Sequence, residues 1–221
     1  APRRVEENRF VSGTYGLYLV GPSGAVGNGT VVRGNVFEQA THSSGAFVYL
    51  TYHDDVLVEG NVASGFSKGI ELTEADGSVV VRGNRFNTSY GIDVTNAHAE
   101  NGGALAVERN RIDASTRGLY VHNSAGTAEL PIRVWNNQIL VTGSSNNEGV
   151  QLNTVSHTQF FHNSVLLTGH GGTVLYQVNG STGLVLRNNL LAADGGAWVL
   201  RMQTPAGVST DYNGLYTTGG T

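Results

Sequence analysis

The chain has 221 residues, contains no cysteine and carries a formal net charge of −4 at pH 7. The missing cysteines exclude disulfides, thiolate metal sites and cysteine nucleophiles, and the acidic balance gives no support for nucleic-acid binding. No stretch is both long and apolar enough to span a membrane. The length and the abundance of glycine, 31 residues, fit one elongated domain over residues 1–221.

A short frame recurs along the chain at intervals of about 23 to 27 residues. It consists of an apolar residue, two variable residues, Asn, one variable residue and a second apolar residue, as in Val32 to Phe37. The asparagines of the frame are Asn8, Asn35, Asn61, Asn84, Asn110, Asn137, Asn163, Asn188 and Asn213. A period in this range indicates a solenoid, and Asn both tolerates a sharp bend and bonds to the amide of a stacked copy. One Asn per coil therefore predicts an asparagine ladder at one corner.

Strand patterns flank each asparagine. Before it, apolar residues alternate with polar or smaller ones, as at Val79 and Val81. A short strand follows it, and a third strand opens with Gly about 7 to 12 residues after the Asn, as at Gly69 and Gly118. Each coil is therefore expected to hold three strands.

This pattern resembles the right-handed parallel β-helix repeat of pectate-lyase-like proteins, over essentially all of the chain. The resemblance implies an all-β solenoid of about eight to nine coils, in a group that holds lyases, hydrolases, epimerases and non-catalytic surface proteins. The leucine-rich repeat is the rival solenoid, but Val outnumbers Leu and the second half of each coil reads as a strand. Because repeats begin near residue 5 and stop soon after Asn213, the domain is expected to be a fragment of a larger protein that lacks its end caps.

Residues at equal offsets from successive asparagines should stack, because neighbouring coils lie about 4.8 Å apart. Two positions before each Asn stand, in order, Glu6, Arg33, Glu59, Arg82 and Glu108. Their alternating signs predict a structural salt-bridge ladder. The column then continues with Trp135, Phe161 and Leu186. Three apolar residues on an outward face predict a contact with a second subunit or with a covering tail.

The outward residues of the glycine-led strands are the chemical candidates. Counting alternation from the buried positions gives a first column of Tyr18, Tyr49, Glu71, Asp93, Tyr120, Gln151, Gln177 and Arg201. Two residues further along each strand lies a second column of Thr51, Thr73, Thr95, His122, Asn153, Asn179 and Gln203. Aromatic rings, carboxylates, amides and an imidazole on one flat face suit a polysaccharide groove. The resemblance also implies this face, because pectate-lyase-like enzymes carry their sites there.

Glu71 and Asp93 are expected as neighbours in adjacent coils, about 5 Å apart, with Tyr120 and His122 one coil further. Two such carboxylates would share a cation, or would divide the acid and base roles of glycoside hydrolysis. Tyr120 and His122 beside a carboxylate would instead run β-elimination on a uronic acid. These four residues are the catalytic candidates, and ordinary polar residues on a solvated strand are the alternative.

The polysaccharide-binding candidates lie on the same face and are Tyr18, Tyr49, Gln151, Asn153 and Arg201. Lys68 and Arg117 precede Gly69 and Gly118, so no basic residue is expected in the column beside Glu71 and Asp93. An Arg- or Lys-base calcium lyase is therefore disfavoured.

Loop residues add two further possibilities. Glu74 and Asp76 would join Glu71 and Asp93 around one Ca²⁺, the single cofactor considered besides none, although the spacing matches no diagnostic calcium motif. His53 faintly resembles part of the Tyr, His and Asp set of alginate epimerases.

The sequence thus predicts an extracellular or cell-surface carbohydrate-active lyase, epimerase or hydrolase. A non-catalytic segment of a large bacterial surface or stalk protein and a sugar-binding module are the alternatives.

Overall fold

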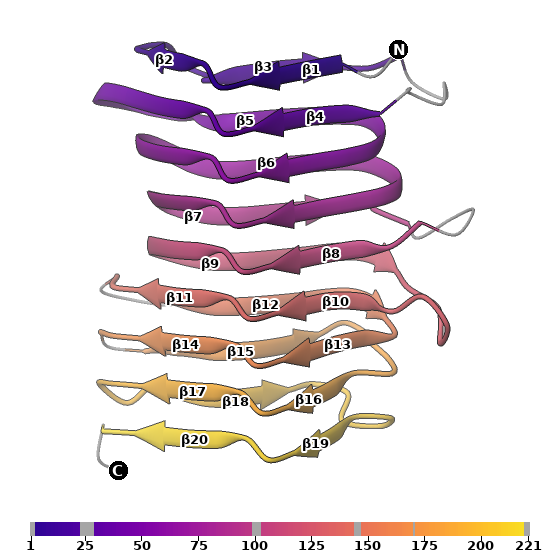
Figure 1. The fold of residues 1–221 in the computed structure, drawn as a ribbon. Helices are drawn as coiled ribbons and strands as arrows, with labels where there is room; N and C mark the ends of the chain where they lie inside the picture. The colour runs from indigo at the N-terminus through magenta and orange to yellow at the C-terminus, as the bar shows by residue number, and fades with distance from the viewer. Residues whose placement is uncertain (1–2, 23–28, 99–102, 144–146, 170, 219–221) are drawn as a thin grey trace.

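The computed structural model describes residues 3–22, 29–98, 103–143, 147–169 and 171–218, and of residues 39–43 it describes the backbone alone. The described residues form one sheet system of 20 strands without a helix. A helix long and apolar enough to cross a membrane is accordingly absent from these ranges. The strand pairings are parallel, and the strands stack coil upon coil (Figure 1). The predicted parallel β-helix is confirmed.

Each coil contributes to three parallel sheets. The pre-ladder sheet contains the strands that end just before the asparagine ladder, and it consists of β1 (Arg3–Glu6), β4 (Thr30–Arg33), the ends of β5 (Val36–Glu59) and β6 (Val62–Arg82), β8 (Leu105–Glu108), β10 (Ile132–Trp135), β13 (Thr158–Phe161), β16 (Val185–Arg187) and β19 (Ser209–Asp211). The post-ladder sheet consists of β2 (Arg9–Val11), the starts of β5, β6, β7 (Arg85–Thr95) and β9 (Arg111–Ala125), and β11 (Gln138–Val141), β14 (Ser164–Leu167), β17 (Leu190–Ala193) and β20 (Gly214–Thr217).

The glycine-led sheet carries the candidate chemistry and lies behind the other two in Figure 1. It consists of β3 (Leu17–Val20), the later parts of β5, β6, β7 and β9, and β12 (Asn147–Ser156), β15 (Gly172–Val178) and β18 (Trp198–Met202). In β5 and β6 the expected separate strands run together into one. Left-handed residues such as Tyr52 (φ 59°) and Glu74 (φ 52°) turn the corner there while the hydrogen-bonded ladder continues.

The asparagine ladder forms as predicted, with one correction. In a typical step Asn84 donates from its backbone N and from Nδ2 to Oδ1 of Asn110, both at 3.0 Å. Near the C-terminal end the ladder residue is Asn189 rather than Asn188, since Asn163 donates to Asn189 and Asn189 donates to Asn213 at 2.8 Å. Asn188 is exposed and has a left-handed backbone (φ 55°). The residue just before each ladder asparagine adopts this conformation at the corner, so Asn188 precedes the ladder position. Because Asn188 and Asn189 are adjacent, the repeated sequence frame could be aligned with either of them as the ladder residue.

This one-residue shift also corrects the apolar column. Leu186 pairs with Phe160 and is buried in the core, and Arg187 follows Phe161 in the outward column. Trp135 and Phe161 stack with ring centroids 5.9 Å apart, so the outward apolar column is shorter than predicted. The prediction that Leu186 takes part in a subunit or tail contact is therefore wrong, because this side chain is buried in the core.

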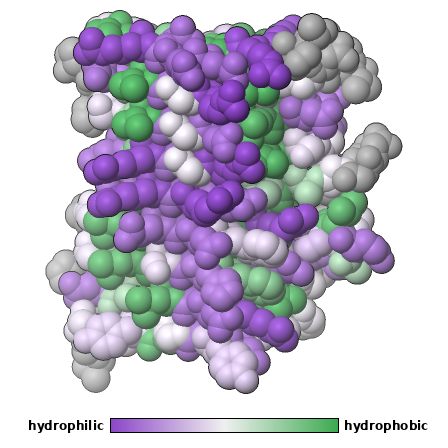
Figure 2. Space-filling model, viewed as in Figure 1, coloured by the Kyte–Doolittle hydropathy of each residue, from purple (hydrophilic) through white to green (hydrophobic). Residues whose placement is uncertain are grey.

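The predicted charge column forms pairs rather than a continuous ladder. Arg33 contacts Glu6 at 3.0 Å and Arg82 contacts Glu59 at 2.7 Å. Glu108 instead lies 3.8 Å from Arg109, its chain neighbour. The column runs along the pre-ladder sheet on the face shown in Figure 2, where hydrophilic side chains cover much of the surface. Its partly exposed pairs help to fix the register but contribute little individually.

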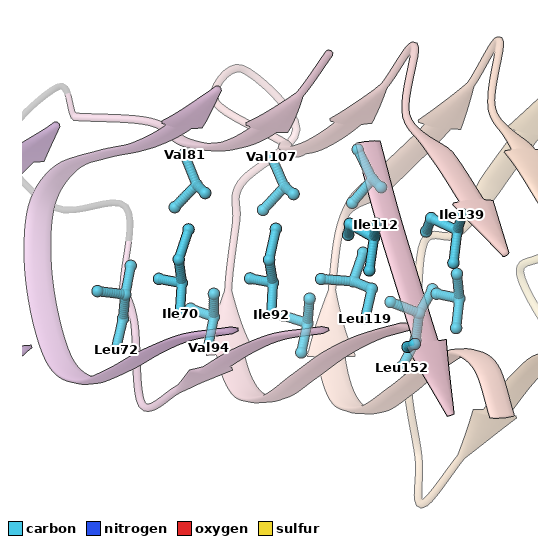
Figure 3. Close-up of a cluster of buried hydrophobic side chains, with 14 of the residues drawn as sticks. Ile70, Leu72, Val81, Ile92, Val94, Val107, Ile112, Leu119, Ile139 and Leu152 are labelled. Atoms are coloured by element: carbon cyan, nitrogen blue, oxygen red, sulfur yellow. The ribbon is translucent and has the colours of Figure 1, made fainter. Parts of the chain in front are cut away.

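The core fills the space between the three sheets. Inward residues of successive coils stack in rows, so Ile70, Ile92 and Leu119 lie side by side along the solenoid and face Val81 and Val107 from the opposite sheet (Figure 3). Each of these side chains is no more than 1% exposed. Burial of such an aliphatic side chain contributes about 1.5–3 kcal/mol, so the rows are the main source of stability.

Glycine opens the third sheet because the backbone of the next coil leaves no room for a side chain. A Cβ on Gly91 would lie 2.0 Å from the carbonyl oxygen of Gly118, and a Cβ on Gly118 would lie 2.6 Å from that of Gly149. Two consecutive inward residues, Gly69 and Ile70, also interrupt the strand alternation at this point. That interruption decides which side chains reach the candidate site.

Candidate functional site

The structure places most of the first predicted column in register. Tyr18, Tyr49, Glu71, Asp93, Tyr120 and Gln151 pair in this order across successive strands. The next member is Tyr176 rather than Gln177, and Arg201 follows it. Gln177 is fully buried and donates to the carbonyl of Ser181 at 3.0 Å. Because Val174 and Leu175 are both apolar and both buried, the alternation in β15 could be read in two phases, and the sequence interpretation took the wrong one.

The second column is also confirmed over its first five members. Thr51, Thr73, Thr95, His122 and Asn153 stack in adjacent coils. Val178 occupies the next place, where Asn179 was predicted. Asn179 lies at the following corner in a left-handed conformation (φ 55°), and its Nδ2 donates to Oδ1 of Asn153 at 3.0 Å.

Glu71 is paired with the only lysine of the chain. Lys68 Nζ lies 3.0 Å from both carboxylate oxygens of Glu71, and neither side chain is fully exposed. Lys68 stands three residues before Glu71, which strict alternation would place on the opposite side of the strand. The two inward residues between them, Gly69 and Ile70, restore Lys68 to the same face.

Asp93 is paired with Arg117 from the next coil. Nη2 of Arg117 donates to Oδ1 and Oδ2 of Asp93 at 3.1 and 3.4 Å. Nη1 lies 3.3 Å from Oε1 of Gln151 and 3.8 Å from a carboxylate oxygen of Glu148. The expectation that no basic residue lies beside Glu71 and Asp93 is therefore wrong, because Lys68 and Arg117 contact them, and the sequence interpretation missed Glu148 altogether. The signal for Arg117 and Glu148 was the interrupted alternation at Gly118 and Gly149, which brings the residue before each glycine to the outward face.

Burial changes the protonation equilibria of this group. It raises the pKa of Asp93 above its ordinary value of 3.8, and the neighbouring Arg117 opposes the shift while the Glu71 charge adds to it. Burial likewise raises the pKa of Glu148, again against the attraction of Arg117. The pKa of the Tyr49 hydroxyl is raised by burial and by the Glu71 charge. The buried acids of the site therefore hold protons more strongly than free carboxylic acids do.

Aromatic rings extend the site along the solenoid in both directions. Tyr18 and Tyr49 stack with centroids 4.7 Å apart. The guanidinium of Arg117 lies 4.0 Å from the centroid of the Tyr120 ring, and that ring also stacks on His122 at 5.4 Å. Since the rings stack on one another or on Arg117, they offer edges and hydroxyl groups to a ligand more than free faces.

Amide groups complete the strip on the C-terminal side. Nδ2 of Asn153 donates to the Tyr120 hydroxyl at 3.2 Å, and Nε2 of Gln203 donates to the Tyr176 hydroxyl at 2.7 Å. Arg201 lies 5.0 Å above the Tyr176 ring, several coils from Asp93. Except for Arg201, the predicted site residues from Tyr18 to Asn153 therefore form one continuous polar strip with the ion pairs at its centre.

Two surface hollows lie elsewhere on the solenoid. One, of about 280 Å³, lies on the post-ladder sheet and is lined by apolar residues such as Leu140 and Leu166. Figure 2 shows hydrophobic side chains at this level of the face, near β11 and β14. The other, of about 240 Å³, lies at the corner after β9 and β12 and is lined by residues such as His98 and Thr154. Neither hollow is lined by a residue of the polar strip.

The four acidic residues considered for a Ca²⁺ ion do not converge in the described part of the chain. No group of three or more His, Asp or Glu side chains there could hold an ion. Glu74 accepts from Asn96 at 2.6 Å, and Asp76 lies 3.4 Å from His98, so both have other partners than Glu71 and Asp93. His53 is buried, its Nδ1 lies 2.9 Å from the Thr30 hydroxyl, and burial lowers its pKa. The four carboxylates therefore do not form the predicted Ca²⁺ site.

Comparison with known proteins identifies the family. Residues 3–141 match the family model described as "Periplasmic copper-binding protein (NosD)". No curated protein and no solved structure matches the chain significantly. The donors in the described residues do not fit copper, which takes His, Cys and Met ligands, because the chain has no cysteine and one methionine, and no three of the described His, Asp and Glu side chains come together as a metal site. The ladder, the parallel coils and this match over more than half of the residues show that the chain belongs to the NosD family of periplasmic β-helix proteins.

Proposed function

We propose that this periplasmic β-helix binds a polysaccharide along the glycine-led sheet and cleaves it with the carboxyl pair Glu71 and Asp93. The observation that carries the proposal is the position of these two groups. They stand in adjacent coils at the centre of a strip of hydroxyl, amide and aromatic groups. A sugar chain needs many hydrogen-bond partners along its length, and an extended strip of this kind supplies them.

The two carboxyl groups differ in their environment, as glycoside hydrolysis requires. The raised pKa of Asp93 favours its protonated form more than in a free carboxylic acid, so Asp93 is the candidate acid for the leaving oxygen. Glu71 is held as the ion-pair partner of Lys68 and is the candidate base or nucleophile. Tyr120 and His122 line the next coil and would contact the bound sugar beside Asp93.

Sugar binding without turnover is the second candidate, and a specific observation favours it. Both carboxylates are already paired with cations, and the two hollows described above lie away from them. An enzyme that closes around its substrate would exclude water more fully than this open strip does. The same strip would then act as a binding surface along which a glycan lies.

The test is incubation of the chain with a panel of neutral, amino and uronic-acid polysaccharides, followed by reducing-end and unsaturated-product assays. Hydrolysis predicts new reducing ends that Asp93→Asn and Glu71→Gln abolish. Asp113→Asn is the matched control, because Asp113 lies on the post-ladder sheet and contacts only Arg111 among the ion pairs described, at 3.9 Å. Binding without products would support the second candidate, and a folded chain that binds no glycan would refute both.

A further inference from the structure

The charge balance of the polar strip bears on which sugar it can take. Three carboxylates lie at its centre, Glu71, Asp93 and Glu148, together with two cations, Lys68 and Arg117. The group thus carries one more negative than positive charge when all of its members are ionised, which is the form that binds the glycan, and Asp93 takes up the proton that it delivers as acid once the glycan is bound. A ligand that approaches it meets a site with an acidic excess.

Both cations are engaged by the acids of the site itself. Lys68 contacts both oxygens of Glu71 at 3.0 Å. Arg117 is shared between Asp93, at 3.1 and 3.4 Å, and Glu148, at 3.8 Å, and its side chain is only 21% exposed. The Tyr120 ring covers the guanidinium at 4.0 Å. A carboxylate of the ligand would therefore compete with Asp93 and Glu148 for Arg117.

We infer that the strip selects a glycan without carboxylate groups, and that it prefers sugars bearing a free amine over neutral sugars. The inference rests on the proposed function and names its substrate class. A uronic-acid chain would add negative charges to a centre that already has an excess of them, and like charges at this range are repulsive. An ammonium group would instead pair with the acid that the two cations leave incompletely neutralised. Hydroxyl groups of a neutral sugar can donate to the same carboxylate oxygens without this added attraction.

This preference differs from the uronic-acid elimination that the sequence suggested. Elimination at a uronate needs groups that stabilise the negative charge developing on the substrate carboxylate, in addition to a base, and cations do this most strongly. At the centre of the strip, the described cations are committed to Glu71, Asp93 and Glu148. Arg201, which is exposed, lies several coils away, over Tyr176. It would contact a long acidic chain at one end only.

The experiment is calorimetric titration of the chain with three oligosaccharides of equal length: a glucosamine hexamer, its N-acetylated counterpart and a galacturonate hexamer. A pH near 6 keeps an amine of ordinary pKa protonated. We expect the glucosamine hexamer to bind about fivefold tighter than the N-acetylated hexamer at low salt, which corresponds to one partly exposed ion pair, and the galacturonate hexamer to bind weakest. The difference should shrink in high salt.

Two matched variants separate the acidic excess from general charge effects. Glu148→Gln removes the excess charge and should reduce the preference for the amine about two- to fivefold. Glu108→Gln is the control, since its side chain is 22% exposed against 24% for Glu148 but lies on the pre-ladder sheet. It should leave the preference unchanged.

The outcomes distinguish the inference from the function on which it rests. Tightest binding of the galacturonate hexamer, or equal binding of all three, would overturn the inference and leave glycan binding standing. If none of the three hexamers binds to a chain with an intact β-sheet circular dichroism spectrum, glycan binding itself is overturned, and the inference with it.

Discussion

Arg117 joins two coils of the solenoid by donating from Nη2 to both carboxylate oxygens of Asp93, at 3.1 and 3.4 Å. The same guanidinium lies 3.8 Å from Glu148 on the opposite side. Arg117 therefore stands between two partly buried acids that it alone compensates among the ion pairs described.

Replacement of Arg117 by Met should destabilise the protein. The change keeps part of the apolar stem but leaves Asp93 and Glu148 without their cation, and their side chains are only 17% and 24% exposed. We expect a loss of about 2–3 kcal/mol in the free energy of unfolding by urea denaturation, somewhat less than for a fully buried pair. Arg111→Met is the control: Arg111 lies 3.9 Å from Asp113 and is 53% exposed, so its loss should cost less than about 1 kcal/mol. Equal effects of the two variants would contradict the role assigned to Arg117.

The stability of the protein should depend on the protonation of Asp93. Burial raises the pKa of this carboxyl in the folded state, so the folded chain binds the proton at a pH where the unfolded chain does not. The stability contributed by that proton is fully present below the ordinary pKa of 3.8 and is lost as the pH rises through the raised value. Wild type should therefore gain stability relative to Asp93→Asn as the pH falls from neutrality toward about 4.

Thermal unfolding of both proteins over this pH range measures the effect. Glu148, whose pKa is shifted in the same direction, is present in both chains, so its contribution largely cancels in the difference. Parallel curves for the two proteins would show that Asp93 titrates normally.

The register of the ladder can be tested at two neighbouring asparagines. Asn189 accepts from the backbone N and Nδ2 of Asn163, and it donates to the carbonyl of Phe160 and to Asn213. Asn189→Ala should therefore leave buried groups unpaired and cost about 3 kcal/mol. Asn188 is exposed and left-handed, so Asn188→Gly should change stability by less than about 0.5 kcal/mol. Chemical denaturation of both variants decides the register, and a reversed order of the two losses would restore the frame first inferred from the sequence.

The glycine column should tolerate no side chain. In Gly91→Ala the new Cβ would lie 2.0 Å from the Gly118 carbonyl oxygen and 2.7 Å from Ile112 Cγ2, so neighbouring coils must separate. We expect a loss above about 3 kcal/mol or failure to fold, measured by the melting temperature. Gly60→Ala is the matched control: its Cβ would meet nothing within 4 Å, and the cost is only that of a left-handed alanine, about 1 kcal/mol. A Gly91→Ala protein as stable as Gly60→Ala would show that the coils yield easily here.

The fold was predictable because its signals repeat. A single asparagine frame is weak, but its recurrence fixed the period, the parallel stacking and the order Tyr49, Glu71, Asp93, Tyr120 in the polar strip. Errors arose where the local sequence allowed two phases. The pair of asparagines at 188–189 and the adjacent apolar residues Val174 and Leu175 each admitted a shift of one residue, and packing against the neighbouring coil decided between them.

The ion pairs of the site could not be predicted from alternation alone. Period-two counting assigns Lys68 and Glu71 to opposite faces, because three residues separate them. The two consecutive inward residues at each glycine depend on contact with the backbone of the next coil, which is a tertiary effect. The carboxylates were therefore found from the sequence, whereas the cations that determine their charge balance were not.

The asparagine ladder gives the solenoid an electrical direction. From Asn8 to Asn189, each ladder asparagine donates its side-chain amide to the oxygen of the asparagine in the following coil, and none is reversed. The amide dipoles thus align head to tail and strengthen one another, as peptide dipoles do in a helix. Their oxygens face the coil of Asn8, and their hydrogens face the coil of Asn213. The two ends of the stack therefore differ in polarity, so a coil that pairs well with one end is not electrostatically equivalent at the other.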